Sequence, residues 1–312
     1  MDIFCYVRKK HIAATILTVA CCVIMVMFPS ITLYSARKAI SLWMTDVMPA
    51  LLPFFICVNF LMGLGMASCL NPPLFTLAMS VMSGYPMGAK IIGDMRRQGE
   101  ISLENAKRLF SFCSTSGPAF IMGAVGAGML NSEKSGIAIA IAHYSGAAIN
   151  GLLFKKLLNK SNKSDRKKMP VIGGHTINEK NFQDLFTEAI LKSLKSLGVI
   201  LSYMVLFMLL TDIIQSSGIL FILEAQHERA FAKGIIEMTV GCSSISECSY
   251  LAESARCIAC SFIISWGGLS VIGQSMSMLN GSGISLGYIF MTKLTHGLFS
   301  AVVAFVISLF MV

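Results

Sequence analysis

The sequence predicts an all-α, polytopic membrane protein, and three observations support this fold class. Of its 312 residues, 55% are hydrophobic and only 13% are charged, about half the charged share typical of a soluble domain. The mean hydropathy is +0.71. The apolar runs are separated by short polar stretches, and the length allows roughly eight to ten membrane-embedded segments of ~20 residues. A soluble fold would need more polar surface, whereas lipid solvates an apolar exterior.

Residues 1–48 predict an N-terminal span followed by an interfacial helix. The apolar run Ile12–Phe28 follows a basic cluster, as in a signal peptide, but every later segment is also membrane-like. We therefore expect an uncleaved first helix. Residues 33–47 mix apolar residues with Arg37, Lys38 and Asp46, a pattern typical of an amphipathic helix at the membrane surface.

The first repeat is predicted at residues 49–156 and begins with a span at 49–67. Two apolar segments on either side of Ser83–Pro86 are each too short to cross a bilayer. Because a Gly-Pro turn joins them, residues 72–98 predict a re-entrant helical hairpin.

A broken helix is predicted next, at residues 103–130. Ser114–Pro118 interrupts it, because proline cannot donate a backbone hydrogen bond and glycine weakens a helix. A full span at 136–154 completes this repeat.

A polar, Lys-rich segment at 157–181 predicts a cytoplasmic linker, and residues 182–312 predict a second repeat. Its expected parts are a hairpin at 218–256, with its tip near Gly241–Ser244, and a helix at 257–279 that is broken at Trp266–Gly268.

The two halves resemble each other in element order and in a few residues. Phe112, Gly117 and Gly123 each precede a matching residue by 150 positions, and His143 precedes His296 by 153. Duplicated, Gly/Pro-interrupted segments at corresponding positions point to a transporter.

The distribution of basic residues predicts the orientation. The Lys/Arg clusters at 8–10, 96–97, 107–108 and 155–168 should face the cytoplasm. The N-terminus is then cytoplasmic, the repeat is inverted and the C-terminus lies across the membrane. Lys293 is expected near the inner end of the last helix, where it could snorkel.

The interrupted segments are the candidate binding site. Unwound backbone in a membrane must be satisfied by protein, water or ligand, and helix N-termini that begin near Met87 and Pro118 would favour an anionic group. A packing kink without ligand is the competing interpretation. The predicted substrate-binding residues are Ser83, Gly84, Tyr85, Pro86, Lys90, Ser114, Thr115, Ser116, Gly117, Pro118, Glu237, Thr239, Gly241, Ser265, Gly267 and Gly268.

Three ionisable residues form a candidate proton or coupling-ion site: Glu237, His143 and His296. A carboxylate at membrane depth is costly and therefore suggests function, although a buried protonated glutamate is the alternative. The histidines could equally be hydrogen-bonded core residues. Lys90 lies four residues before Asp94, so an ion pair competes with contact to an anion.

The sequence offers little support for an enzyme, a metal-binding protein or a nucleic-acid-binding protein. No Walker, HExxH or Rossmann motif is present, so we expect neither an enzyme nor a cofactor. Most of the ten cysteines lie in apolar segments, without a second pair or histidines at metal-ligand spacing. Each basic cluster abuts an apolar run, which favours membrane orientation over nucleic-acid binding.

Two motifs carry a resemblance to a known family. The residues are Met82-Ser-Gly-Tyr-Pro-Met-Gly-Ala-Lys-Ile-Ile-Gly-Asp94 and Arg108-Leu-Phe-Ser-Phe-Cys-Ser-Thr-Ser-Gly-Pro118. Through them the chain resembles the YlbJ family of sporulation integral membrane proteins, also called SpoVV, over most of its length. That family carries a Gate domain shared with nucleoside transporters. The family-like positions are Ser83, Gly84, Pro86, Gly88, Lys90, Ser116, Gly117 and Pro118, with Glu237, Thr239 and Gly241 in the second half.

The resemblance implies transport of a small organic anion, dipicolinic acid, from the mother cell across the outer forespore membrane. The expected partners are that anion and the lipid bilayer, and a homo-oligomer is left open. The alternatives are a nucleoside or other solute carrier on the same architecture and a membrane scaffold for a sporulation complex. A scaffold would not need duplicated broken helices.

Overall fold

The computed structural model describes residues 12–65, 72–161 and 181–310, and all regular secondary structure in these ranges is helical. The helices of the first half are α1 (Ile12–Met27), α2 (Pro29–Leu42), η3 (Trp43–Val47), α3 (Met48–Gly63), α5 (Pro72–Ser83), α6 (Met87–Arg97), α7 (Leu103–Cys113), η4 (Ala119–Met129) and α8 (Glu133–Ser161). Those of the second half are α9 (Phe182–Ser216), η5 (Ile219–Ile222), α10 (Gln226–Ile236), α11 (Met238–Ser246), α12 (Glu253–Trp266), α13 (Gly268–Met278) and α14 (Leu286–Ser308). The expected all-α fold class is confirmed.

Several of these helices fit a membrane. Within the described ranges, four helices are long and apolar enough to span a bilayer, counting α12 and α13 as one, and the bent pair of α1 and α2 raises the number to five. Large apolar side chains lie exposed along one face of α14, among them Leu298, Val302 and Phe305. Exposed apolar stripes of this kind suit contact with lipid.

The N-terminal helices pack against the second half of the chain. The expected interfacial helix at 33–47 is α2 with the π-helical turn η3, and both continue into α3. Helices α2 and α3 pack along α9, and a sharp bend of 105° lies between α1 and α2. A partly buried polar contact joins α2 to α9, with the Ser35 hydroxyl donating to Asp212 Oδ2 at 2.5 Å. Small and polar residues of this helix therefore face a neighbouring helix.

The first hairpin consists of α5 and α6, which a turn at Gly84–Pro86 joins, and the first broken helix consists of α7 and η4. The break between α7 and η4 spans Ser114–Pro118, as the Gly-Pro sequence predicts. After the break, η4 has π-helical geometry throughout its length, and α8 then returns along it.

The second hairpin consists of α10 and α11, and its tip differs from the prediction. The turn is at Glu237, four residues before the expected tip at Gly241–Ser244, and those residues belong to α11. Glu237 has extended backbone geometry, and its side chain accepts a hydrogen bond from the Val240 amide, so it is the N-cap of α11. The second break is at Gly267, between α12 and α13, and both Gly267 and Gly268 have left-handed backbone geometry.

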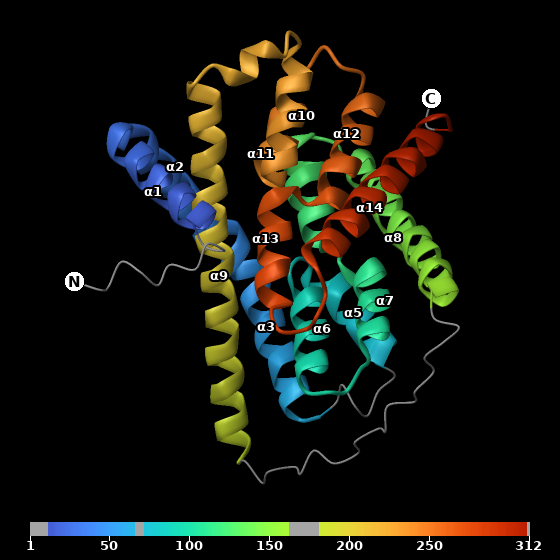
Figure 1. The fold of residues 1–312 in the computed structure, drawn as a ribbon. Coiled ribbons are helices and arrows are strands. Elements are labelled where there is room, and N and C mark those ends of the chain that lie inside the picture. Colours follow the sequence, from blue (N-terminus) through green and yellow to red (C-terminus); the bar gives the residue numbers. More distant parts are fainter. Residues whose placement is uncertain (1–11, 66–71, 162–180, 311–312) are drawn as a thin grey trace, which may run out of the picture.

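The two halves enter the molecule from opposite ends. In Figure 1 the hairpin of α5 and α6 occupies the lower half and the hairpin of α10 and α11 the upper half. The first residues of α9 lie at the bottom of this view, and the end of α14 lies in its upper part. The linker prediction at 157–181 falls largely outside the described residues, as does the N-terminus.

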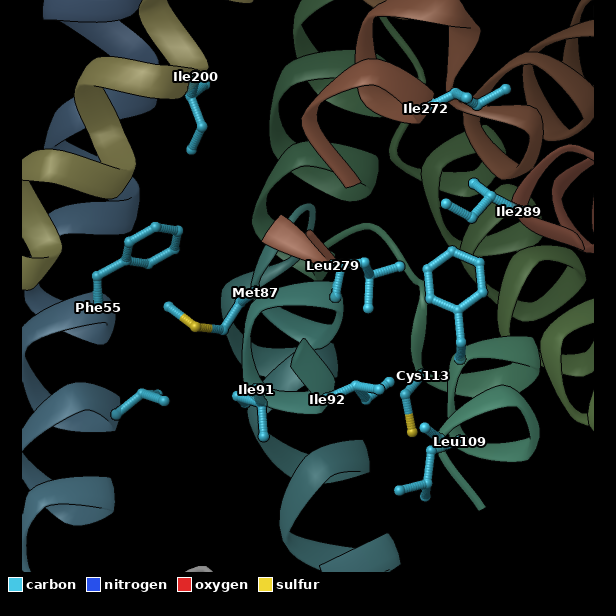
Figure 2. Close-up of a cluster of buried hydrophobic side chains, with 14 of the residues drawn as sticks. Phe55, Met87, Ile91, Ile92, Leu109, Cys113, Ile200, Ile272, Leu279 and Ile289 are labelled. Carbon is cyan, nitrogen blue, oxygen red and sulfur yellow. The ribbon is translucent and has the colours of Figure 1, made fainter. Parts of the chain in front are cut away.

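Apolar packing holds the first hairpin in the centre of the fold. Figure 2 shows Met87, Ile91 and Ile92 of α6 among side chains of neighbouring helices, including Phe55 of α3 and Leu109 of α7. All five belong to one buried cluster. A second cluster unites η4, α8, α10, α11 and α12. Each hairpin is thus embedded in apolar side chains, while its tip reaches the middle of the protein.

Candidate functional site

The tip of the first hairpin touches the first helix break through backbone alone. A Cβ atom on Gly84 would lie 2.6 Å from the Gly117 amide nitrogen, and Gly84 has a φ of +71°. Both features require glycine, because a side chain would clash and L residues rarely adopt this φ. The sequence predicted both glycines as site residues, and the structure brings them together.

The second hairpin and the second break meet in the corresponding way. A Cβ atom on Gly268 would lie 2.9 Å from the Ile236 carbonyl oxygen and 3.2 Å from Glu237 Cα. The Glu237 side chain is buried and accepts from the Val240 amide at 2.7 Å. Its capping role explains a carboxylate at this depth, and whether it also carries a proton stays a prediction.

His143 on α8 connects the two breaks. Its Nε2 accepts a hydrogen bond from the Ser116 amide at 2.9 Å, so a neutral ring carries its proton on Nδ1. That nitrogen lies 2.7 Å from Ser265 Oγ, which donates to Ser300 Oγ at 2.8 Å. The His143 imidazole therefore forms hydrogen bonds with a backbone amide in the first break and with a hydroxyl beside the second break.

The two predicted repeat-equivalent histidines are neighbours. His296 Nε2 lies 2.9 Å from the His143 carbonyl oxygen, and the ring centroids are 4.7 Å apart. A Cβ atom on Gly146 would lie 2.9 Å from the Ser300 amide nitrogen. Helices α8 and α14, the last helices of the two repeats, thus cross closely beside the breaks.

Lys293 on α14 is the site residue that sequence reasoning missed. It is 1% exposed, and its Nζ donates to the Tyr85 hydroxyl at 2.6 Å and to the Ser114 carbonyl at 3.3 Å. It therefore does not snorkel to a membrane surface. The available signal was a lysine in the apolar final helix, three residues before His296, which points to function more than to orientation.

Two hydroxyls at the site have no protein partner. Ser83 Oγ at the hairpin tip and Thr115 Oγ1 in the first break are both buried and make no hydrogen bond in the described residues. An unsatisfied buried hydroxyl costs about 1–3 kcal/mol. Such groups indicate a place for water or a ligand.

Three predicted site residues lie elsewhere. Lys90 Nζ contacts Asn59 Oδ1 and Asp94 Oδ2, the latter at 3.2 Å, which is the ion pair that the spacing favoured. Gly241 packs on Gly234 of the same hairpin. Thr239 lines a separate groove of about 580 Å³ between α2, α9 and the second hairpin.

Pro86, Gly267 and Pro118 shape the site by ending or starting helices. Pro86 is the N-cap of α6 and follows a cis peptide bond. A Cβ atom on Gly267 would lie 3.4 Å from Lys293 Cε, so the second break also borders the lysine. The centre thus combines a cation, unpartnered hydroxyls and helix ends, all enclosed by protein.

This arrangement suits recognition of a small polar solute. The cation and the free hydroxyls are donors, and no group of three or more metal-binding side chains occurs in the described parts of the chain. Lys293, His143 and the two free hydroxyl residues Ser83 and Thr115 are each less than a tenth exposed, so these groups are closed to solvent in this conformation.

Comparison with known proteins agrees with the sequence motifs. The chain is similar to the sporulation integral membrane protein YlbJ of Bacillus subtilis (strain 168), with 28% identity over 314 residues that cover 88% of this chain and 77% of that protein. No protein-family model and no solved structure matches the chain. The match to YlbJ supports the assignment of this chain to the YlbJ family of sporulation integral membrane proteins.

Proposed function

We propose that the chain is a membrane transporter for a small organic anion, with dipicolinic acid as its substrate, and that it exports this anion from the mother cell across the outer forespore membrane during sporulation. The observation that carries the proposal is the pair of unpartnered buried hydroxyls, Ser83 and Thr115, where the first hairpin tip meets the first break. The name of the similar Bacillus subtilis protein supports the sporulation role.

The architecture supports a carrier over a scaffold. Two hairpins enter from opposite ends (Figure 1), and each tip lies against a helix break. Broken helices paired across an inverted repeat are typical of secondary transporters, which bind solute near the bilayer midplane. A docking protein has no need for buried polar backbone, because each such group must be satisfied at a cost.

The chemistry supports an anion over a nucleoside. The central groups are donors: the Lys293 ammonium, the free hydroxyls, and helices such as α6 and η4 that begin at the site. A dicarboxylate can accept from all of them. The Glu237 carboxylate, the acceptor at the second hairpin tip, is already engaged by the Val240 amide.

The test is uptake of radiolabelled dipicolinate into proteoliposomes that contain the purified full-length protein. We expect saturable uptake above that of protein-free liposomes, competition by unlabelled dipicolinate, and none by the neutral pyridine-2,6-dicarboxamide. No uptake above protein-free liposomes would refute the proposal, and competition by nucleosides but not by dipicolinate would establish the nucleoside carrier instead.

A matched pair of variants links uptake to the break. Gly117→Leu should abolish uptake, because the side chain would enter the space between the break and the hairpin tip. Gly123→Leu in η4 is the control, since a Cβ atom there meets nothing within 4 Å. Equal uptake by both well-folded variants would show that the break is a packing kink.

A further inference from the structure

Lys293 is a buried lysine without a carboxylate partner. Both hydrogen-bond partners of its ammonium are neutral, one a phenol and one a peptide carbonyl. None of the ion pairs found in the described residues involves it. An ionised ammonium that is removed from water without a counter-ion is strongly disfavoured, so Lys293 would carry its charge only when an anion binds beside it.

The groups around Lys293 Nζ come from the first hairpin, both breaks, α8 and α14, and none of the groups named below is an anion. The first hairpin contributes Tyr85, whose ring centroid lies 3.9 Å from Nζ. The first break contributes the Ser114 carbonyl, and the second break contributes Gly267. On α8 and α14 the nearest titratable residues are the imidazoles of His143 and His296.

The position of the ammonium is also informative, because two helices end there. Helix α7 ends at Cys113, and Lys293 contacts the next carbonyl, that of Ser114. Helix α12 ends at Trp266. The Tyr85 hydroxyl, which accepts a hydrogen bond from Lys293, donates to the Ile264 carbonyl oxygen at 3.2 Å. Terminal carbonyls are unsatisfied within a helix and carry partial negative charge. In carriers with broken helices, such carbonyl ends hold a dissolved coupling cation.

We propose that Lys293 is a tethered cation that occupies this position in place of a dissolved metal ion and binds a carboxylate of the transported anion. The inference rests on the proposed function, and it adds the residue that supplies the charge. The carboxylate would accept a charge-assisted hydrogen bond from Nζ, with the Ser83 and Thr115 hydroxyls as further donors. Transport would then need neither Na⁺ nor K⁺.

The first test uses the wild-type protein in proteoliposomes. Dipicolinate uptake should be unchanged when choline replaces Na⁺ and K⁺ on both sides of the membrane. Loss of uptake in choline, with uptake restored by Na⁺ or K⁺, would overturn the tethered-cation proposal while leaving the transport function in place. Absence of uptake under all ionic conditions would instead refute the proposed function.

The second test measures dipicolinate affinity in detergent for three substitutions of the lysine. Lys293→Gln and Lys293→Ala should weaken binding roughly 10- to 100-fold, the range expected for a charge-assisted hydrogen bond. Lys293→Arg should retain more affinity because it keeps the charge. Lys192→Gln is the control, since that lysine is exposed and paired with Glu188 on α9.

Chemical rescue separates a lost cation from a lost fold. Ethylammonium added to Lys293→Ala should restore part of the affinity, since a small ammonium can enter the space that the side chain leaves. Uncharged ethanol should not. Wild-type affinity in Lys293→Gln, or equal effects of the two additives on Lys293→Ala, would overturn the proposal.

Discussion

The protein buries two lysines at the first hairpin, and their surroundings are opposite. At the base of the hairpin, Lys90 contacts Asp94 and Asn59, and Asp94 also accepts from Arg97 at 2.6 Å. At the tip, Lys293 contacts only neutral groups. A lysine whose charge is balanced by a carboxylate of the protein binds a solute anion weakly. A lysine without such a carboxylate can pair with the anion.

The base of the hairpin therefore has a structural role. The Asn59 amide of α3 also donates to the Ser193 hydroxyl of α9 at 2.8 Å. Arg97 donates to the carbonyls of Met278, the last residue of α13, and of Asn280 in the loop that follows. This network ties α6 to three other parts of the fold, so the base can stay fixed. The tip, which is held by close backbone contacts and few hydrogen bonds, is the part that can adapt to a solute.

The largest effect that separates the two regions is expected from Asp94→Asn. The substitution leaves the Lys90 ammonium without a counter-charge and should lower the free energy of unfolding by about 2–3 kcal/mol, less than for a fully buried pair because Asp94 is 28% exposed. Dipicolinate affinity should not change. Thermal unfolding in detergent and a binding titration check the two parts, and an affinity loss with a normal unfolding midpoint would make Lys90 a binding residue.

At the tip, Gly84→Ala should cost about 1–3 kcal/mol, because its Cβ atom would overlap the Gly117 amide and its φ is positive. The control is Gly287→Ala on α14, where a Cβ atom meets nothing within 4 Å. Thermal unfolding of both variants is the measurement. Equal midpoints would show that hairpin and break do not touch in the membrane.

The smallest expected effect is that of the free hydroxyls. Ser83→Ala and Thr115→Val should leave stability unchanged or raise it, since neither hydroxyl has a protein partner. Each should weaken dipicolinate binding about 2- to 10-fold, as expected for one neutral hydrogen bond. Ser80→Ala, whose hydroxyl donates to the Thr76 carbonyl at 2.6 Å, is the control that should leave affinity unchanged. Unaltered affinity in both test variants would place the anion elsewhere.

The features that sequence could predict are those with local causes. Short apolar lengths and Gly/Pro turns located the first hairpin and both breaks, because backbone constraints act within a few residues. The second hairpin tip was placed four residues late, since Glu237 ends one helix and caps the next without any glycine or proline at the turn.

The composition of the centre depends on tertiary contacts that no local pattern encodes. The approach of His143 to Ser116 and Ser265 joins positions 27 and 122 residues apart. The depth of Lys293 likewise follows from the packing of α14 against α8 and α12. Its contact with Tyr85 joins positions 208 residues apart, so the local pattern predicts that Lys293 lies on a helix but not which residues it contacts.

The most direct test of the central claim is the thermal stabilisation that dipicolinate gives to the wild type, Lys90→Gln and Lys293→Gln. A ligand stabilises a protein only as far as it binds the folded state. We predict that Lys90→Gln unfolds at a lower temperature than the wild type but shows the full ligand-induced shift. Lys293→Gln should unfold at or above the wild-type temperature and show almost no shift. A full shift in Lys293→Gln, or its loss in Lys90→Gln, would contradict the assignment of Lys293 as the cation that binds the anion.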